Sequence, residues 1–225
     1  MTFLICSCVA FIATHFGVSS TPLRGVLLRV LGDNAYLGVY SLMALITLGA
    51  MIYSYSAVPH TDFLWLPSAL AFKITKVVVL FAVVLLVMGT MTRNPTAIKM
   101  ESAINDDLQG TLKITRHPTQ WAILLFSVGH LIANGDKASI VFFGTLGLVS
   151  FFGTFAMDAR KKDPDNEDWQ TFYARTSNIP FAALLSGRAT IVKGDINFLA
   201  IGIGIALYGG IYWLHNMVSG GQSLF

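Results

Sequence analysis

The sequence predicts an all-α fold: a polytopic integral membrane bundle of about six transmembrane helices, forming one domain over residues 1–225. Two observations carry this prediction. Hydrophobic residues make up 54% of the chain and charged residues 12%, whereas soluble domains carry about 25% charged residues. The apolar residues also come in long blocks, and about 20 of them in a helix cross a bilayer. No basic stretch is dense enough for nucleic acid, so that partner is excluded and membrane lipid is expected.

Six apolar segments come near the length that spans a membrane. The fourth and fifth are joined only by Asn134-Gly135-Asp136-Lys137, which predicts an antiparallel helical hairpin. Ser20-Thr21-Pro22 has the polar cap and first-turn proline of a helix start, and residues 23–31 are expected to lie on the membrane surface. Asp163-Pro164-Asp165 is a turn signal in a charged segment. The six segments cover about residues 2–18, 36–58, 67–91, 119–133, 138–157 and 197–218.

The basic residues gather in the loops on one side of the predicted bundle. Every lysine and arginine except Lys73, Lys76 and Lys137 lies in a loop after the first, third or fifth segment. We call this face side B and the opposite face side A. The positive-inside rule places side B in the cytoplasm, and therefore both termini on the non-cytoplasmic side.

Three histidines are candidate functional residues, because an ionisable group in a membrane segment is a functional candidate by default. His15 and His130 lie inside apolar blocks, and Ser127 shares the helix face of His130. A neutral imidazole is a common haem ligand. Arg116 and His117 stand at the start of the fourth segment, where they could hold an anionic phosphate or carboxylate. The structural alternatives are a helix cap for the latter pair and a hydrogen bond to a neighbouring helix for His15 and His130.

Three motifs follow one another along nearly the whole chain. The first is Thr14-His15-Phe16-Gly17 with Pro22-Leu23-Arg24. The second runs from Ile114-Thr115-Arg116-His117-Pro118 to Gly129-His130-Leu131-Ile132-Ala133-Asn134-Gly135-Asp136. The third is Phe172-Tyr173-Ala174-Arg175-Thr176-Ser177-Asn178-Ile179-Pro180. Together they resemble the NnrU family, to which the zeta-carotene isomerases of plants and cyanobacteria are related.

The resemblance implies a b-type haem whose iron is held by two histidines, and the matching positions here are His15 and His130. His117 stays open as the partner of His15, because the predicted topology puts His15 near side B and His130 near side A. The isomerases have a cysteine three residues before the second histidine, thought to exchange as a ligand. Ser127 stands at that position here, so the same exchange is not available. The predicted cofactor-binding set is His15, His130, His117, Arg116, Ser127, Arg175 and Asn178.

Two functions follow from the resemblance. One is a cis–trans isomerase of a hydrophobic polyene, in which iron acts as a Lewis acid or redox centre. The other is an accessory factor in denitrification, since bacterial members are associated with the handling of nitrite and nitric oxide. The expected location is the bacterial inner (cytoplasmic) membrane, crossed several times.

An S-adenosylmethionine-dependent membrane methyltransferase is the alternative. Arg116-His117-Pro118, and the stretch from Glu167 to Tyr173 before Pro180, also resemble the isoprenylcysteine carboxyl methyltransferases. That family places both motifs around its cofactor on the cytoplasmic side. Thr119-Gln120 stands where the family has a tyrosine soon after the proline. A scaffold or assembly factor without a cofactor is the third possibility.

Overall fold

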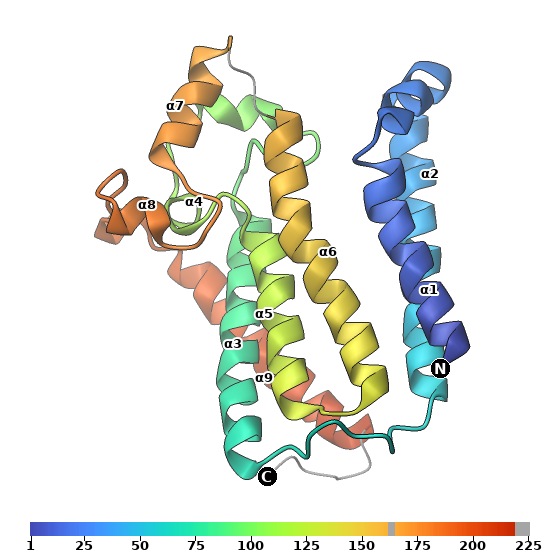
Figure 1. Cartoon of the computed structure of the whole chain (residues 1–225). Helices are drawn as coiled ribbons and strands as arrows, with labels where there is room; N and C mark the ends of the chain where they lie inside the picture. Colours follow the sequence, from blue (N-terminus) through green and yellow to red (C-terminus); the bar gives the residue numbers. More distant parts are fainter. Residues whose placement is uncertain (162–164, 219–225) are drawn as a thin grey trace.

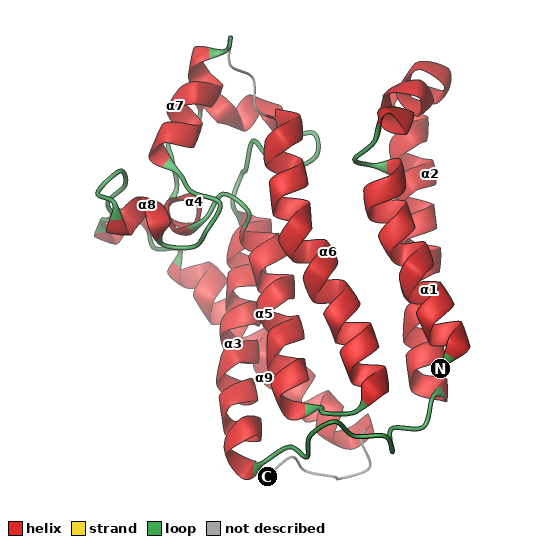
Figure 2. Cartoon of the chain, in the orientation of Figure 1, coloured by secondary structure: helices red, strands yellow, loops and turns green. Residues whose placement is uncertain are grey.

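The computed structural model of the chain describes residues 1–161 and 165–218. In these ranges the chain is helical, and Figure 2 shows the helices joined by loops without a strand. The prediction of an all-α membrane bundle is confirmed. Of the turn signal at residues 163–165, the first two residues lie outside the described ranges. Four described helices are long and apolar enough to cross a membrane: Pro22–Ala57, Ala69–Met91, Lys137–Lys161 and Phe198–His215. Two further apolar helices are shorter: Thr2–Val18 and Pro118–Ala133.

The first two helices form a pair beside the rest of the bundle (Figure 1). Helix α1 (Thr2–Ile12) continues into η1 (Ala13–Val18), a π-helical turn that holds His15. Helix α2 (Pro22–Ala57) begins as predicted, with Thr21 accepting a hydrogen bond from the Leu23 N–H and Pro22 in the first turn. It is broken at Gly32, where φ is +74°, so residues 22–31 form a separate helical segment.

Helix α3 (Ala69–Met91) packs against both α5 (Pro118–Ala133) and α9 (Phe198–Val218). Helix α6 (Lys137–Lys161) covers α5 on one side and α1 on the other. An apolar cluster fills the space between α1, α2 and α6, and it includes Leu4, Cys8, Phe11, Met51, Phe142 and Phe143.

One glycine of α9 allows close packing of two helices. A Cβ on Gly204 would lie 2.8 Å from Cα of Val84 in α3, so only glycine allows these backbones to approach. Gly202, Gly209 and Gly210 have no such neighbour within 4 Å.

The two ends of the bundle differ. Short elements gather at the end where α5 begins (Figure 1): η2 (Glu101–Asn105), α4 (Gly110–Ile114), α7 (Glu167–Arg175), α8 (Ala182–Leu185) and η3 (Lys193–Asp195). At the opposite end, the loop after α2 crosses the α5–α6 turn, with Leu64 N–H donating to the Gly135 carbonyl at 2.8 Å. Asp136 accepts a hydrogen bond from the Ser139 N–H at 2.9 Å and contacts His60 at 2.8 Å. The predicted α5–α6 hairpin is therefore present, and a distant loop fastens it.

Candidate functional site

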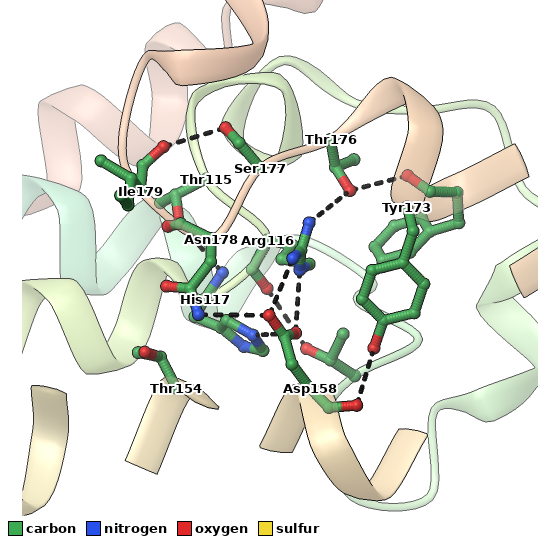
Figure 3. Close-up of polar contacts among 12 residues, drawn as sticks. Thr115, Arg116, His117, Thr154, Asp158, Tyr173, Thr176, Ser177, Asn178 and Ile179 are labelled. Carbon is green, nitrogen blue, oxygen red and sulfur yellow. Dashed lines mark hydrogen bonds and ion pairs between the residues drawn. The ribbon is translucent and has the colours of Figure 1, made fainter. Parts of the chain in front are cut away.

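Asp158, near the end of α6, is the centre of a polar cluster at the side B end (Figure 3). Arg116 binds its carboxylate with two nitrogens, Nε to Oδ1 at 2.8 Å and Nη2 to Oδ2 at 2.7 Å. His117 donates from Nε2 to Oδ1 at 2.7 Å, and Asn178 donates from Nδ2 to Oδ2 at 3.1 Å. A bidentate arginine contact is among the stronger pairings that proteins use. We call these four residues the Asp158 cluster.

Backbone pairing brings the two sequence motifs of the cluster together. The Arg116 N–H donates to the Ser177 carbonyl at 2.9 Å, and the Phe181 N–H donates to the Ile114 carbonyl at 2.8 Å. The Thr115 hydroxyl donates to the Asn178 carbonyl at 2.6 Å. Pro118 begins α5 directly after this segment, so Arg116 and His117 are fixed at the helix start. Residues 114–117 and 177–181 thus form one platform beside the end of α6.

Tyr173 of α7 contacts two residues of the Asp158 cluster. Its ring lies 4.5 Å from the Arg116 guanidinium carbon, and its hydroxyl donates to the Asp158 backbone carbonyl at 3.3 Å. A guanidinium over an aromatic face is an attractive pairing. Burial and the nearby Asp158 carboxylate raise the pKa of Tyr173 to about 12, because both disfavour the phenolate.

We expect the phenol of Tyr173 to stay protonated at a pH where an ordinary tyrosine has ionised. The raised pKa favours the folded protein below the ordinary tyrosine value of about 10, and this contribution is lost as the pH rises towards 12. At pH 11, the native protein and Tyr173→Phe should therefore show the same phenolate absorbance. An excess of phenolate in the unsubstituted protein at pH 11 would contradict the assignment.

Two buried atoms of the cluster have no hydrogen-bond partner within residues 1–161 and 165–218: Nδ1 of His117 and Oδ1 of Asn178. His117 is 0% exposed, and the Asp158 side chain is 19% exposed. The ion pairs satisfy Arg116 and the Nε2 of His117, so neither is left to hold an external phosphate or carboxylate. The predicted anion-binding role of Arg116 and His117 is thus not favoured by this geometry. The arrangement instead ties together α5, α6, α7 and the segment after α7.

His15 and His130 have the same local arrangement in different helices. The His15 Nδ1 donates to the Phe11 carbonyl at 2.9 Å, and the His130 Nδ1 donates to the Phe126 carbonyl at 2.8 Å. In each case the ring centroids of the histidine and the phenylalanine are 4.1 Å apart. An imidazole whose Nδ1–H is held by a carbonyl presents Nε2 as its free ligating atom. Taken singly, each histidine is suited to bind a metal.

The structure does not bring these two histidines together. His15 contacts Tyr40 with centroids 6.0 Å apart, whereas His130 stacks on Phe143, which in turn contacts Tyr55. Tyr40 and Tyr55 lie in the unbroken part of α2, and at 1.5 Å per residue they are about 22 Å apart along its axis. Two nitrogens on one metal ion lie within about 4 Å of each other, since each bond is about 2 Å long. One haem iron held by both does not fit this arrangement.

The other predicted site residues lie in different surroundings. The Nε2 of His117 donates to Asp158 at 2.7 Å. Ser127 is buried where α5 packs on α6, and its hydroxyl donates to the Ile123 carbonyl at 2.8 Å. Arg175 is exposed at the end of α7, outside the Asp158 cluster. Of the predicted set, the structure therefore brings together Arg116, His117 and Asn178.

Asp158 was missed by sequence reasoning. It follows directly on the predicted fifth segment, which ends at residue 157, and was not among the candidate residues. The available signal was a single carboxylate bordering an apolar block, on the same side as the cations of the other two motifs. A carboxylate at such a border is expected to pair with a cation, because a buried charge without a partner is strongly destabilising.

The fold and its polar ends define a helical integral membrane protein with a packed ion-pair cluster at one end. A family model described as NnrU protein matches residues 3–223, and the chain belongs to the NnrU family. It is 30% identical over 119 residues to the chloroplastic 15-cis-zeta-carotene isomerase of Arabidopsis thaliana, covering 49% of this chain and 31% of the relative. The corresponding enzyme of Zea mays is 30% identical over 86 residues, covering 37% and 23%. The matches thus span less than a third of these curated relatives. No solved structure matches.

Proposed function

We propose that this protein is a membrane-embedded, isomerase-like enzyme that interconverts cis and trans forms of a hydrophobic polyene. The carrying observation is the similarity to two 15-cis-zeta-carotene isomerases within the NnrU family. A polyene dissolves in the bilayer and would reach the protein from the side, where the long helices are apolar. His15 and His130 each offer an unengaged Nε2 in apolar surroundings.

We propose haem b as the cofactor of this activity. The proposed location of the protein is the bacterial inner membrane. Since His15 and His130 are separated along the bundle, we do not place one iron between them. Each histidine is a candidate ligand by itself, and the hydrogen bond at its Nδ1 fixes the orientation of its ring. Nitric oxide is a second proposed ligand, through the role in nitrite and nitric oxide handling that the family resemblance implies.

The test is direct. The purified full chain, in liposomes loaded with 15-cis-zeta-carotene, is expected to change the isomer ratio seen by chromatography, and its absorption spectrum is expected to show a Soret band. His130→Ala or His15→Ala should remove the band if that histidine ligates iron, and His215→Ala, an exposed histidine of α9, is the matched control.

The possible outcomes separate the parts of the proposal. A colourless protein that still isomerises the polyene would contradict the proposed haem and support the proposed isomerase activity. A haem-loaded protein that leaves the polyene unchanged would contradict the proposed isomerase activity. A spectral change on adding nitric oxide would then favour the denitrification role. For the methyltransferase alternative, binding heat with S-adenosylmethionine is the corresponding measurement.

A further inference from the structure

A pocket lined by basic side chains lies at the side B end, apart from the Asp158 cluster. Three cationic residues and no acidic ones line it: Lys113 of α4, Arg175 of α7 and Arg188 after α8. The remaining lining is small or apolar, and consists of Leu108, Gly187, Ala189 and Thr190. We call this the basic pocket. Its charge selects for a negatively charged ligand.

The three cations are differently held. Arg188 is fixed, because its Nη1 donates to the carbonyls of Ala174 at 3.1 Å and Thr176 at 2.9 Å, and its Nε donates to the Ser186 hydroxyl at 2.9 Å. Lys113 pairs with Asp195 at 2.7 Å, which offsets one positive charge. Arg175 is exposed and makes no hydrogen bond or ion pair to another described residue. The basic pocket therefore has one fixed guanidinium and one with all its donors available.

Acidic side chains near Arg175 line a different pocket from the basic one. A second pocket shares Arg175 and contains Asp106, Asp107 and Asp168. Asp106 is already paired with Arg93 at 3.1 Å. An anion in the basic pocket would therefore meet Arg175 and Arg188 without a carboxylate in the same lining.

The basic pocket is lined by residues that are close in sequence to the starts of two apolar helices. Lys113 precedes the start of α5 by a few residues, and Thr190 comes shortly before α9 begins at Phe198. The segment around the pocket also carries strongly exposed apolar side chains, with Leu185 of α8 exposed to 88%. The others in this segment are Ile179, Phe181, Ile191 and Val192. Basic and apolar side chains thus stand next to each other, as a lipid with an anionic headgroup and acyl chains requires.

We propose that the basic pocket binds the phosphate headgroup of an anionic membrane lipid. Arg175 holds the phosphate oxygens through charge-assisted hydrogen bonds, for which the fork of its guanidinium is well shaped. Arg188 adds its positive charge and its remaining Nη2 donors. The exposed side chains of residues 179–192 contact the acyl chains. Arg175 belongs to the third family motif, and this proposal makes it a ligand of a lipid phosphate instead of a cofactor. The site is independent of any isomerase activity.

The experiment compares lipids that differ only in headgroup. Phosphatidylglycerol is titrated into the detergent-purified full chain, and the midpoint of thermal unfolding is followed, with phosphatidylcholine of the same acyl chains as reference. Phosphatidylglycerol is expected to raise the midpoint and phosphatidylcholine to leave it nearly unchanged. Arg175→Gln is expected to weaken the apparent affinity for phosphatidylglycerol about fivefold, the effect of one basic residue at a membrane surface.

Arg29→Gln is the matched control, because it removes the same charge from an exposed side B arginine far along the chain from the pocket. Equal loss of affinity in Arg29→Gln and Arg175→Gln would overturn the proposal, because surface charge alone would then explain the binding. So would the full shift with inorganic phosphate alone, since a lipid would not be needed. Arg188→Gln should weaken the affinity further, and its midpoint without lipid reports any loss of the contacts to Ala174 and Thr176.

Discussion

Asp158→Ala is expected to lower the free energy of unfolding by about 3 kcal/mol, near the lower end of the range for breaking a buried ion pair. The substitution leaves Arg116 and the fully buried His117 without their shared acceptor. It also removes the acceptor of Asn178, so the segment after α7 loses a contact with α6. Denaturant unfolding in detergent, followed by circular dichroism, measures the change.

Asp62→Ala is the control for this substitution. Asp62 pairs with Lys137 at 2.8 Å, but both side chains are about half exposed or more. Exposed ion pairs contribute about 0–1 kcal/mol, so this variant should unfold almost as the unsubstituted protein does. If the two variants lose similar amounts of stability, the Asp158 cluster is not the tie that its geometry indicates.

Gly135→Ala is the second substitution with a large expected effect, a loss of about 3 kcal/mol or more. A Cβ at position 135 would lie 1.8 Å from the backbone oxygen of Trp65. This neighbour is backbone, so no side-chain rotation relieves the clash and the loop after α2 must move. The hydrogen bond from the Leu64 N–H to the Gly135 carbonyl would then be lost. Overpacking alone commonly costs about 1–3 kcal/mol, and the lost backbone contact adds to it.

Gly144→Ala provides the comparison within the next helix. A Cβ there has no neighbour within 4 Å, and alanine is favoured over glycine inside a helix by about 0.5–1 kcal/mol. This variant should therefore be at least as stable as the unsubstituted protein in the same unfolding experiment. A stable Gly135→Ala would show that the loop after α2 is not seated on the α5–α6 turn.

The long apolar helices could be predicted within a few residues because an apolar block of spanning length has few other uses. The short helices α4, α7 and α8 were not predicted. The start of α2 was also predictable, since Thr21 and Pro22 act locally. The break at Gly32 is likewise local, and it separates the predicted surface segment from the long part of α2. These features depend on residues that are neighbours in the chain.

The site could be predicted only in part, because its contacts join distant segments. Arg116, His117 and Asn178 were predicted from motifs, and backbone pairing brings them together. The sequence places Asp158 at the border of an apolar block, but its partners are set by the packing of α6 against α5. The role of Gly135 was hidden for the same reason, since Trp65 is far from it in the chain. The family resemblance pairs His15 and His130 on one iron, whereas the predicted order of the helices places them near opposite ends, and the structure agrees with the helix order.

The hydrogen bonds at His15 and His130 have a consequence for ligand affinity. A free imidazole must give up rotational entropy when it binds, and immobilising a side chain costs about 0.5–1.5 kcal/mol. Here the Phe11 and Phe126 carbonyls and the adjoining rings already restrict both imidazoles. A ligand of either Nε2 would bind a ring whose rotational entropy was already lost during folding. Its affinity would therefore be higher than for a freely rotating histidine.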